Sequence, residues 1–366
     1  MENMKIRVNP LPAPTWRWLR INDTEIQLPD EVTESLMETS VPEVKTGTFD
    51  EREFEILQNV ETGMGGAFKE FTSAAPVDPF LFKIAEGEKA KEPLSFRIYL
   101  TGTESTVNRF YFSAPENSEY TVVMYLTAEE AAVEASGLSA TLDARFFVGQ
   151  GAKLRLVQVF DQPEQMSAYS DVGAHVEKAG SFEVLQIALK GAKTFLGVAA
   201  DLAETEAHLG IETAYQAEAG QHVDLNYVAR HRGKKTTTDM EVKGVLWEGA
   251  SKSCRATVDF IRGCKESKGV EREDVLLLGE NVVNKTIPLI LCQEEDVEGE
   301  HGATIGDLSD EILWYFRSRG IDDETAYQLM ARGRLLGSIR KIPEDELRRE
   351  LLERLQESEA DTAEEA

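Results

Sequence analysis

The sequence predicts a mainly β protein whose body is a parallel β-helix or solenoid, with helical regions at both ends. From about Leu94 to Cys292, short segments that alternate apolar and polar residues, or are fully apolar, follow one another with almost no helical period between them. A glycine stands just before a new strand at residues 151, 180, 220 and 249, and the intervals of 29, 40 and 29 residues indicate a recurring unit with loop insertions. A β-sandwich is the alternative, although the Asn-Gly and Asp-Gly turns of ordinary hairpins are absent.

Residues 1–90 form a mixed, partly helical region that precedes the β body of residues 91–302. Phe54, Leu57, Val60 and Met64 recur at helical spacing, so we expect them to face a core. The segment ETGMGGAFKEF looks like a glycine-rich phosphate loop, but no Lys-Ser or Lys-Thr follows it and no clear strand precedes it. We therefore interpret it as a turn that ends a helix.

Residues 303–357 form a C-terminal helical module. Ser309 fits the N-cap of a first helix, and Gly320 is placed to end it. A second helix should begin near Asp322 or Asp323, and Pro343 fits the first turn of a third. The third helix carries an apolar stripe made of Leu347, Leu351, Leu352 and Leu355. Residues 358–366 are acidic and small, and we expect them to be disordered.

The charge balance restricts the partners of this chain. Lys and Arg total 39 against 66 for Asp and Glu, which gives a net charge of −27 and makes nucleic acids and anionic membrane surfaces poor partners. The first residues lack the apolar region of a secretory signal, and no apolar run could cross a bilayer. Three widely spaced cysteines argue against a disulfide framework. We therefore expect a cytoplasmic protein with reduced thiols.

The sequence contains no self-contained catalytic motif. A Walker A sequence, a GxSxG elbow, HExxH, CxxC and a dinucleotide fingerprint are all absent, so we expect that the chain is not an enzyme. His208 and His222 are interpreted as strand histidines with hydrogen-bond partners, and Cys254 and Cys264 as small buried thiols. The basic segment ARHRGKKTTTDM, residues 229–240, could hold a phosphate or an acidic partner loop, but a solvated turn is the favoured interpretation.

One segment near the end of the β body is rich in metal-ligand side chains. Within ten residues it contains Cys292, Glu294, Glu295, Asp296, Glu298, Glu300 and His301. Thiolate, carboxylate and imidazole together could bind iron or zinc. An acidic loop that leads into the helical module explains the same composition equally well.

The stretch from Lys285 to Gly333 resembles the end of the SufB/SufD family of iron–sulfur cluster assembly proteins. The resemblance rests on an ordered combination: a Thr-x-Pro strand, an acidic Asp-Val pair, the turn His301-Gly302-Ala303-Thr304 and a Ser-Arg-Gly-Ile helix end. The opening LPAPTWRWLRIN is also similar to SufD-like members. SufB members typically carry His-Glu-Ala-Thr where this chain has Gly302, so the resemblance is to SufD.

The resemblance implies a right-handed parallel β-helix flanked by helical regions, working as a scaffold. It implies that a SufC-type ABC ATPase docks on the helical module, and that a SufB-like subunit, or a second copy in a homodimer, pairs with the end of the β-helix. A transient iron–sulfur cluster would be shared at that interface, with none tightly bound by this chain alone. His301 matches the SufD histidine proposed for the cluster site, whereas Gly299 stands where some SufD proteins have a cysteine.

The same resemblance implies where the ATPase would bind. We expect the contact surface to include Trp314, Tyr315, Phe316, Arg319, Tyr327 and Met330. Residues 281–284 contain no cysteine where SufB carries its sulfur-accepting thiol. Two alternatives stay open: a SufB-like homodimeric scaffold, and a metal-dependent β-helix enzyme that uses the carboxylates near His301.

Overall fold

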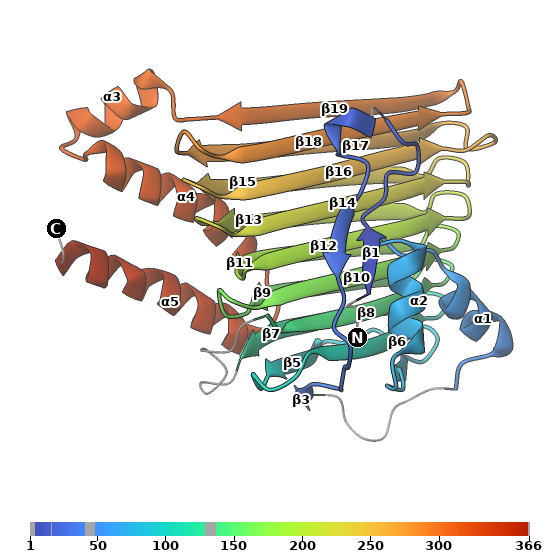
Figure 1. Cartoon of the computed structure of the whole chain (residues 1–366). Helices are drawn as coiled ribbons and strands as arrows, with labels where there is room; N and C mark the ends of the chain where they lie inside the picture. The colour runs from blue at the N-terminus through green and yellow to red at the C-terminus, as the bar shows by residue number, and fades with distance from the viewer. Residues whose placement is uncertain (1–3, 16, 41–47, 129–136, 365–366) are drawn as a thin grey trace.

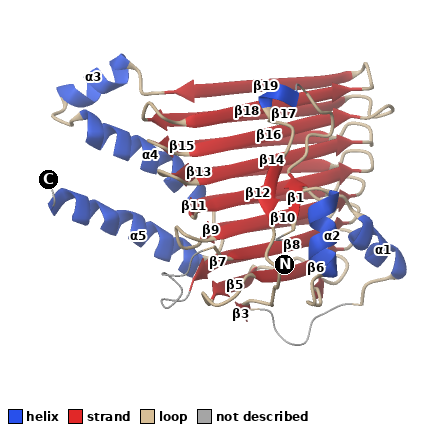
Figure 2. Ribbon diagram, viewed as in Figure 1, coloured by secondary structure: helices blue, strands red, loops and turns tan. Residues whose placement is uncertain are grey.

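The computed structural model describes residues 4–15, 17–40, 48–128 and 137–364. Its body is a parallel β-solenoid of two facing sheets, one built from even-numbered and one from odd-numbered strands (Figures 1 and 2). The chain passes alternately from one sheet to the other, so each strand pairs with the strand two positions along the sequence. The predicted fold class is confirmed, and the β-sandwich alternative was wrong.

The bounds of the strands follow the order of the coils. The even sheet contains β4 (Phe80–Lys83), β6 (Thr106–Ala114), β8 (Ser139–Val148), β10 (Ser167–Val176), β12 (Lys193–Leu202), β14 (His222–His231), β16 (Ser251–Phe260) and β18 (Val283–Cys292). The odd sheet contains β3 (Leu36–Thr39), β5 (Leu94–Leu100), β7 (Glu119–Ala128), β9 (Lys153–Asp161), β11 (Ser181–Lys190), β13 (His208–Ala217), β15 (Thr237–Trp247), β17 (Ser267–Leu278) and β19 (Val297–Gly306). Only β3 is antiparallel to its neighbour within these two sheets.

The glycine intervals of the sequence correspond to the coils. Gly151 and Gly180 precede β9 and β11, which are neighbours in the odd sheet, and Gly220 and Gly249 precede β14 and β16, which are neighbours in the even sheet. An interval of 29 residues is therefore one coil. The interval of 40 residues passes three strands, from β11 to β14, and is one and a half coils. Gly151 and Gly249 have φ angles of 63° and 75°, a left-handed conformation that suits glycine.

Equivalent positions in successive coils stack inside the solenoid. The rings of Phe112 and Phe146 lie 5.2 Å apart between centroids, and those of Phe146 and Phe182 lie 4.9 Å apart. Buried polar side chains form a second file, in which Gln186 donates to Gln158 at 2.9 Å and Tyr227 donates to Gln186 at 3.0 Å. Because each of these groups has a hydrogen-bond partner, the interior tolerates them.

The N-terminal region lies over the outer face of the even sheet. It contains the hairpin of β1 (Lys5–Val8) and β2 (Thr24–Gln27), the 3-10 turn η1 (Arg17–Leu19), and the helices α1 (Glu51–Asn59) and α2 (Gly66–Ala74). The glycine-rich segment lies between the two helices. It was expected to end a helix, but α1 ends earlier, at Asn59, and Gly66 begins α2. A Cβ atom on Gly63 would lie 2.0 Å from the Val198 amide nitrogen, so this segment serves close packing on β12.

Two fully buried aspartates attach the N-terminal region to the even sheet. Asp171 of β10 accepts a hydrogen bond from the Met64 amide at 2.7 Å. Asp224 of β14 accepts hydrogen bonds from Asn9 at 2.7 Å and Thr24 at 2.5 Å, and it pairs with Arg255 at 2.6 Å. Residues distant in sequence are thereby fixed to β10 and β14 of the even sheet.

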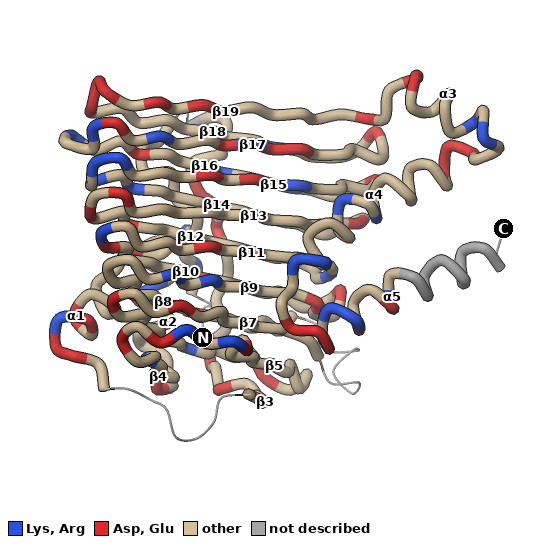
Figure 3. Tube along the Cα trace, turned by 180° about the vertical axis from the view of Figure 1, so that it is seen from behind, with Lys and Arg blue, Asp and Glu red and all other residues tan. Residues whose placement is uncertain are grey.

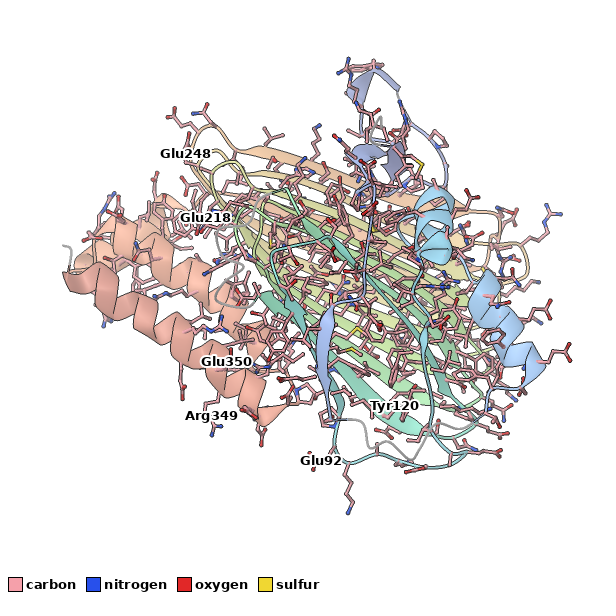
Figure 4. The ribbon with its side chains drawn as sticks, turned by 60° about the horizontal axis from the view of Figure 1, so that its bottom comes forward. Glu92, Tyr120, Glu218, Glu248, Arg349 and Glu350 are labelled. Atoms are coloured by element: carbon pink, nitrogen blue, oxygen red, sulfur yellow. The ribbon has the colours of Figure 1, made fainter. Side chains whose placement is uncertain are left out.

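The C-terminal module consists of α3 (Asp310–Ser318), α4 (Asp323–Ile339) and α5 (Asp345–Glu364). Ser309 and Asp322 cap the first two helices by accepting from the amides of Ile312 and Thr325, as the sequence predicts. Leu335 and Ile339 of α4 and Leu347 and Leu351 of α5 pack against the outer face of the odd sheet. Figure 4 shows Glu350 on the side of α5 that faces the solenoid and Arg349 on the opposite side.

Three boundaries of this module differ from the sequence prediction. The last strand continues to Gly306, past the expected end of the β body at residue 302, because β19 pairs with β17 as far as Leu276. Pro343 precedes α5 by two residues instead of lying in its first turn. Helix α5 runs on to Glu364 through residues for which disorder was expected. Among the residues that the structure describes, every helix is too short or too polar to cross a bilayer.

Candidate functional site

The site forms at the end of the solenoid where β18 and β19 have no further neighbour. Among the strands that the structure describes, β18 pairs only with β16, and β19 pairs only with β17. The inner face of this last coil is therefore not covered by another coil, and β19 is almost entirely exposed. His301 lies on β19 directly opposite Glu271 of β17 in the strand register.

His301 stands at the rim of a small cavity inside this open end. The cavity is lined by Cys254 of β16, by Glu271 and Glu273 of β17, and by Thr286 of β18. These side chains meet because Cys254 and Thr286 are register partners and point into the solenoid, as Glu271 and Glu273 do at alternate positions of β17. The imidazole of His301 at the surface, the thiol of Cys254 and the carboxyls of Glu271 and Glu273 therefore line the same cavity.

The charged groups of this cavity are strongly buried. Lys252 and Glu273 form an ion pair in which the lysine side chain is fully buried, and Lys252 also donates to Thr286 at 3.1 Å. Burial raises the pKa of the Cys254 thiol well above its usual range, and the neighbouring Glu273 carboxylate adds to this effect. Burial also raises the pKa of Glu271 to about 8. The cavity therefore holds a protonated thiol and a protonated carboxyl at neutral pH.

The acidic segment before His301 does not converge on it. Glu294 accepts from the Gly263 amide at 2.9 Å, and Glu298 pairs with Lys268 at 2.7 Å. Cys292 is exposed at the far end of β18. Within the described ranges, no group of three or more His, Cys, Asp or Glu side chains is arranged to hold a metal ion. Metal-ligand side chains that are close in the sequence are therefore separated in space, with Glu294 in a turn and His301 at the rim of the cavity.

The other four histidines have structural partners. His208 contacts Thr237 at 2.7 Å, His222 contacts Ser251 at 2.8 Å, and His175 lies 3.8 Å from Asp201. His231 is fully buried between the hydroxyls of Thr236 and Thr238, and burial lowers its pKa to about 4. The interpretation of His208 and His222 as strand histidines with hydrogen-bond partners is confirmed.

The basic segment 229–240 contains the turn from β14 to β15. Arg230 pairs with Glu61, and Arg232 pairs with Asp201. Figure 3 shows charged residues gathered along the edge where even strands turn into odd strands. These contacts agree with the favoured interpretation as a solvated turn.

The six residues expected to bind a partner separate into two groups. Trp314 and Tyr315 are exposed, with 68% and 52% of their surface accessible, and Arg319 lies over the Tyr315 ring at 5.2 Å. The other three, Phe316, Tyr327 and Met330, pack against a small core formed by Leu276, Leu308, Leu313 and Ala326. The exposed rings of Trp314 and Tyr315 on α3 are therefore supported by Phe316, Tyr327 and Met330, which pack in the core of the module.

Sequence reasoning missed the buried part of the site. Cys254 was interpreted only as a small buried thiol, and Lys252, Glu271 and Glu273 were not considered. A signal was available, because Glu271 and Glu273 occupy the same face of a strand as the buried Val275. Carboxylates at inward positions are costly unless they are paired or protonated, and they often mark functional sites.

The fold and the site together define a parallel β-solenoid with an imidazole, a thiol and two carboxyls around one small cavity at its open end. A family model described as the SufBD core domain of the SUF system for FeS cluster assembly matches residues 98–334. This match covers more than half of the chain, so the chain belongs to the SufBD family.

Individual relatives agree with this assignment. An iron–sulfur cluster assembly SufBD family protein of Archaeoglobus fulgidus is 24% identical over 278 residues, covering 75% of this chain and 73% of the relative. A family protein of Pyrococcus horikoshii is 22% identical over 259 residues, covering 70% and 57%. SufB of Bacillus subtilis is 26% identical over 127 residues, covering 35% and 27%. Matches to family proteins of Mycobacterium leprae and Arabidopsis thaliana span only 15% and 22% of those proteins.

Proposed function

We propose that this chain is a SufD-like scaffold subunit for iron–sulfur cluster assembly, without catalytic turnover of its own. The observation that supports this most is the position of His301 at the exposed rim of a cavity that also contains Cys254 and Glu271. Imidazole and thiolate are both competent ligands for iron in clusters. The cluster is the cargo of this site, and we expect it to be bound only transiently.

The donor set of a single chain is incomplete. One imidazole and one thiol are fewer than the four ligands that an iron–sulfur cluster ordinarily takes from protein. The raised pKa of Cys254 means that iron must displace a proton before the thiolate can bind. We therefore propose that a SufB-like subunit, or a second copy of this chain, covers the open end and supplies the remaining ligands.

A SufB-like homodimeric scaffold is the second candidate, and Cys254 favours it. A thiol within the cavity gives each chain a sulfur ligand that the residues before the Thr-x-Pro strand do not provide. A metal-dependent β-helix enzyme has less support, because the carboxylates near His301 take part in separate contacts. The proposed place of action is the cytoplasm, where thiols such as Cys254 stay reduced.

The proposal assigns the aromatic face of α3 to a SufC-type ABC ATPase. Trp314 and Tyr315 are large, exposed and held by the packed residues beneath them, and aromatic anchors of this kind often dominate binding energy. ATPase motion would then reach the solenoid through α4, whose Leu335 and Ile339 pack on the odd sheet.

Copurification with a SufC-type ATPase tests this assignment. The full chain should retain the ATPase, and the double substitution Trp314→Ala, Tyr315→Ala should weaken binding at least about tenfold, the loss of about 1.4 kcal/mol expected for an interface anchor. Trp18→Ala is the matched control, because Trp18 is an equally exposed tryptophan that is distant in sequence from this module. Equal ATPase binding by all three proteins would contradict the proposed docking surface.

A further inference from the structure

A cleft opens on the outer face of the even sheet, beneath the N-terminal loop of residues 10–25. Its volume is about 960 Å³, near the upper end of the range of small-molecule sites. His222 of β14, Ser253 of β16 and Lys285 of β18 form its floor, and the loop forms the facing wall. Figure 1 shows η1, which belongs to this loop, over the β19 end of the solenoid. Because neighbouring residues of a strand point to opposite faces, the cleft lies on the other side of β16 from Cys254.

The loop is fixed to the even sheet at two points beside Arg20. Arg255 donates to the Ile21 carbonyl at 2.7 Å, and Thr24 donates to Asp224 at 2.5 Å. Arg20 itself has a φ angle of 51°, a left-handed conformation that is uncommon for residues other than glycine. The anchored neighbours therefore hold the Arg20 backbone in a conformation that places its side chain on the cleft.

Most polar side chains that line the cleft already have a partner. The paired groups are Arg7 with Asp23, Glu25 with Lys5, Asn22 with Thr15, Thr24 with Asp224, and His222 with Ser251. Three lining residues differ from these. Within the part of the chain that the structure describes, Arg20, Ser253 and Lys285 have neither an ion pair nor a side-chain hydrogen bond. All three can donate hydrogen bonds, and two of them are cations.

Ser253 points to a ligand more directly than the two cations do. It is only 6% exposed, and its hydroxyl has no hydrogen-bond partner among the described residues. A buried hydroxyl without a partner costs free energy, and a molecule bound in the cleft would supply the missing hydrogen bond. Ser253 and Lys285 are register partners on adjacent strands, which lie about 5 Å apart, so one bound group can reach both side chains.

From these features we propose that the cleft binds a small organic phosphate. The phosphate oxygens accept hydrogen bonds from the Arg20 guanidinium, the Ser253 hydroxyl and the Lys285 ammonium, which are donor types that commonly hold phosphate in proteins. The cleft has more room than one phosphate group needs, and Pro10 and Pro14 provide apolar walls for the organic part of the ligand. The bound molecule thereby links the N-terminal loop to β16 and β18.

The charge of the chain favours a small ligand over a large polyanion. Arg20 and Lys285 have no counter-charge in the cleft, whereas the whole chain has a net charge of −27. Physiological salt screens exposed charges that are more than about 8 Å apart, so a small phosphate interacts mainly with the groups that line the cleft. A nucleic acid or an acidic protein surface would extend beyond the cleft and be repelled by the excess of acidic residues.

Binding of phenyl phosphate to the full chain tests the proposal. This probe combines a phosphate dianion with an apolar ring, and isothermal titration calorimetry measures its dissociation constant. Arg20→Gln and Lys285→Gln should each weaken binding by about tenfold, and Ser253→Ala by about fivefold, because each removes one donor to the phosphate. Inorganic phosphate should bind the wild type about tenfold more weakly than phenyl phosphate, because it has no ring to contact the apolar walls.

Arg262→Gln and Lys234→Gln are the matched controls, because both side chains are exposed cations on turns at the opposite end of the even strands. Both variants should bind phenyl phosphate like the wild type. Ser253→Ala also separates ligand binding from a structural role. Loss of a hydroxyl without a partner should leave the melting temperature of the ligand-free chain unchanged or raise it, whereas the increase caused by phenyl phosphate should be smaller than in the wild type.

Three results would overturn the inference. The first is equal affinity of phenyl phosphate for the wild type, Arg20→Gln and Lys285→Gln, or no binding to the wild type at about 10 mM. The second is citrate, which carries carboxylates and no phosphate, binding as tightly as phenyl phosphate. The third is a glutamate-rich peptide that binds in a Lys285-dependent manner while phenyl phosphate does not, which would assign the cleft to a protein partner.

Discussion

Asp171 and Asp224 should respond in opposite directions to replacement by asparagine. Both side chains are fully buried, and both hold the N-terminal region on the even sheet. Burial raises the pKa of Asp171 from 3.8 to about 7, and the neighbouring Asp143 adds to the effect. Burial alone would also raise the pKa of Asp224, but contacts with His222, Arg255 and Asn9 lower it instead.

The sign and the size of the Asp171 effect follow from linkage. Because the pKa of Asp171 is raised, the folded state favours the protonated carboxyl. The contribution of Asp171 to stability is therefore fully present below pH 3.8 and is lost as the pH rises through about 7. Each pKa unit corresponds to about 1.4 kcal/mol, which limits the loss to about 4 kcal/mol. A neutral asparagine amide would imitate the protonated carboxyl, so Asp171→Asn should raise the free energy of unfolding by about 4 kcal/mol at pH 8 and leave it unchanged near pH 4.

Asp224→Asn provides the matched comparison. A lowered pKa contributes stability above pH 3.8 that is lost only as the pH falls through the folded-state value. Replacement leaves Arg255 buried without its counter-charge, so the free energy of unfolding should fall by about 3–5 kcal/mol at pH 8. Urea unfolding of both variants and the wild type at pH 4, 6 and 8 measures these differences. Destabilisation by Asp171→Asn at pH 8, or a pH-independent difference, would refute the reasoning.

Four further substitutions test a buried histidine and the packing. The contribution of His231 to the free energy of unfolding should fall by about 3 kcal/mol between pH 6.5 and pH 4, because the buried imidazole stays neutral to a pKa of about 4. Urea unfolding should therefore show the stability difference between the wild type and His231→Asn shrinking by that amount as the pH falls. Gly63→Ala should lower the melting temperature through the 2.0 Å approach to Val198, whereas Gly66→Ala, which has open space, should not. Leu335→Ala should lower the free energy of unfolding by about 2–5 kcal/mol and make the helical module more sensitive to protease. Unchanged protease resistance would argue against the packing of this module on the odd sheet.

The coils were predictable because each one repeats a local pattern. A glycine, a turn and an alternating strand recur in each coil. The interval of 40 residues between Gly180 and Gly220 differs from 29 because Gly180 precedes a strand of the odd sheet and Gly220 precedes a strand of the even sheet. The capped starts of α3 and α4 were equally local, since Ser309 and Asp322 each act within one helical turn.

Long-range contacts explain what the sequence could not reveal. The glycine-rich segment gave the pattern of a turn, but only its packing on β12 shows why Gly63 must be small. His301 was found through its motif, whereas Cys254 and Glu271 come from other coils and meet it only because β16 and β17 lie beneath β18 and β19. A site assembled from stacked coils has no contiguous motif to detect.

Cluster loading of the complex with its ATPase tests the central claim most directly. The measurement is iron and acid-labile sulfide bound per chain after anaerobic reconstitution, for the wild type, His301→Ala and His208→Ala, the last being a partly exposed histidine of β13. We expect His301→Ala to lose most of the bound iron and sulfide while it retains the ATPase, and His208→Ala to load like the wild type. Loading of His301→Ala to the wild-type level would show that the open end of the solenoid is not the assembly site.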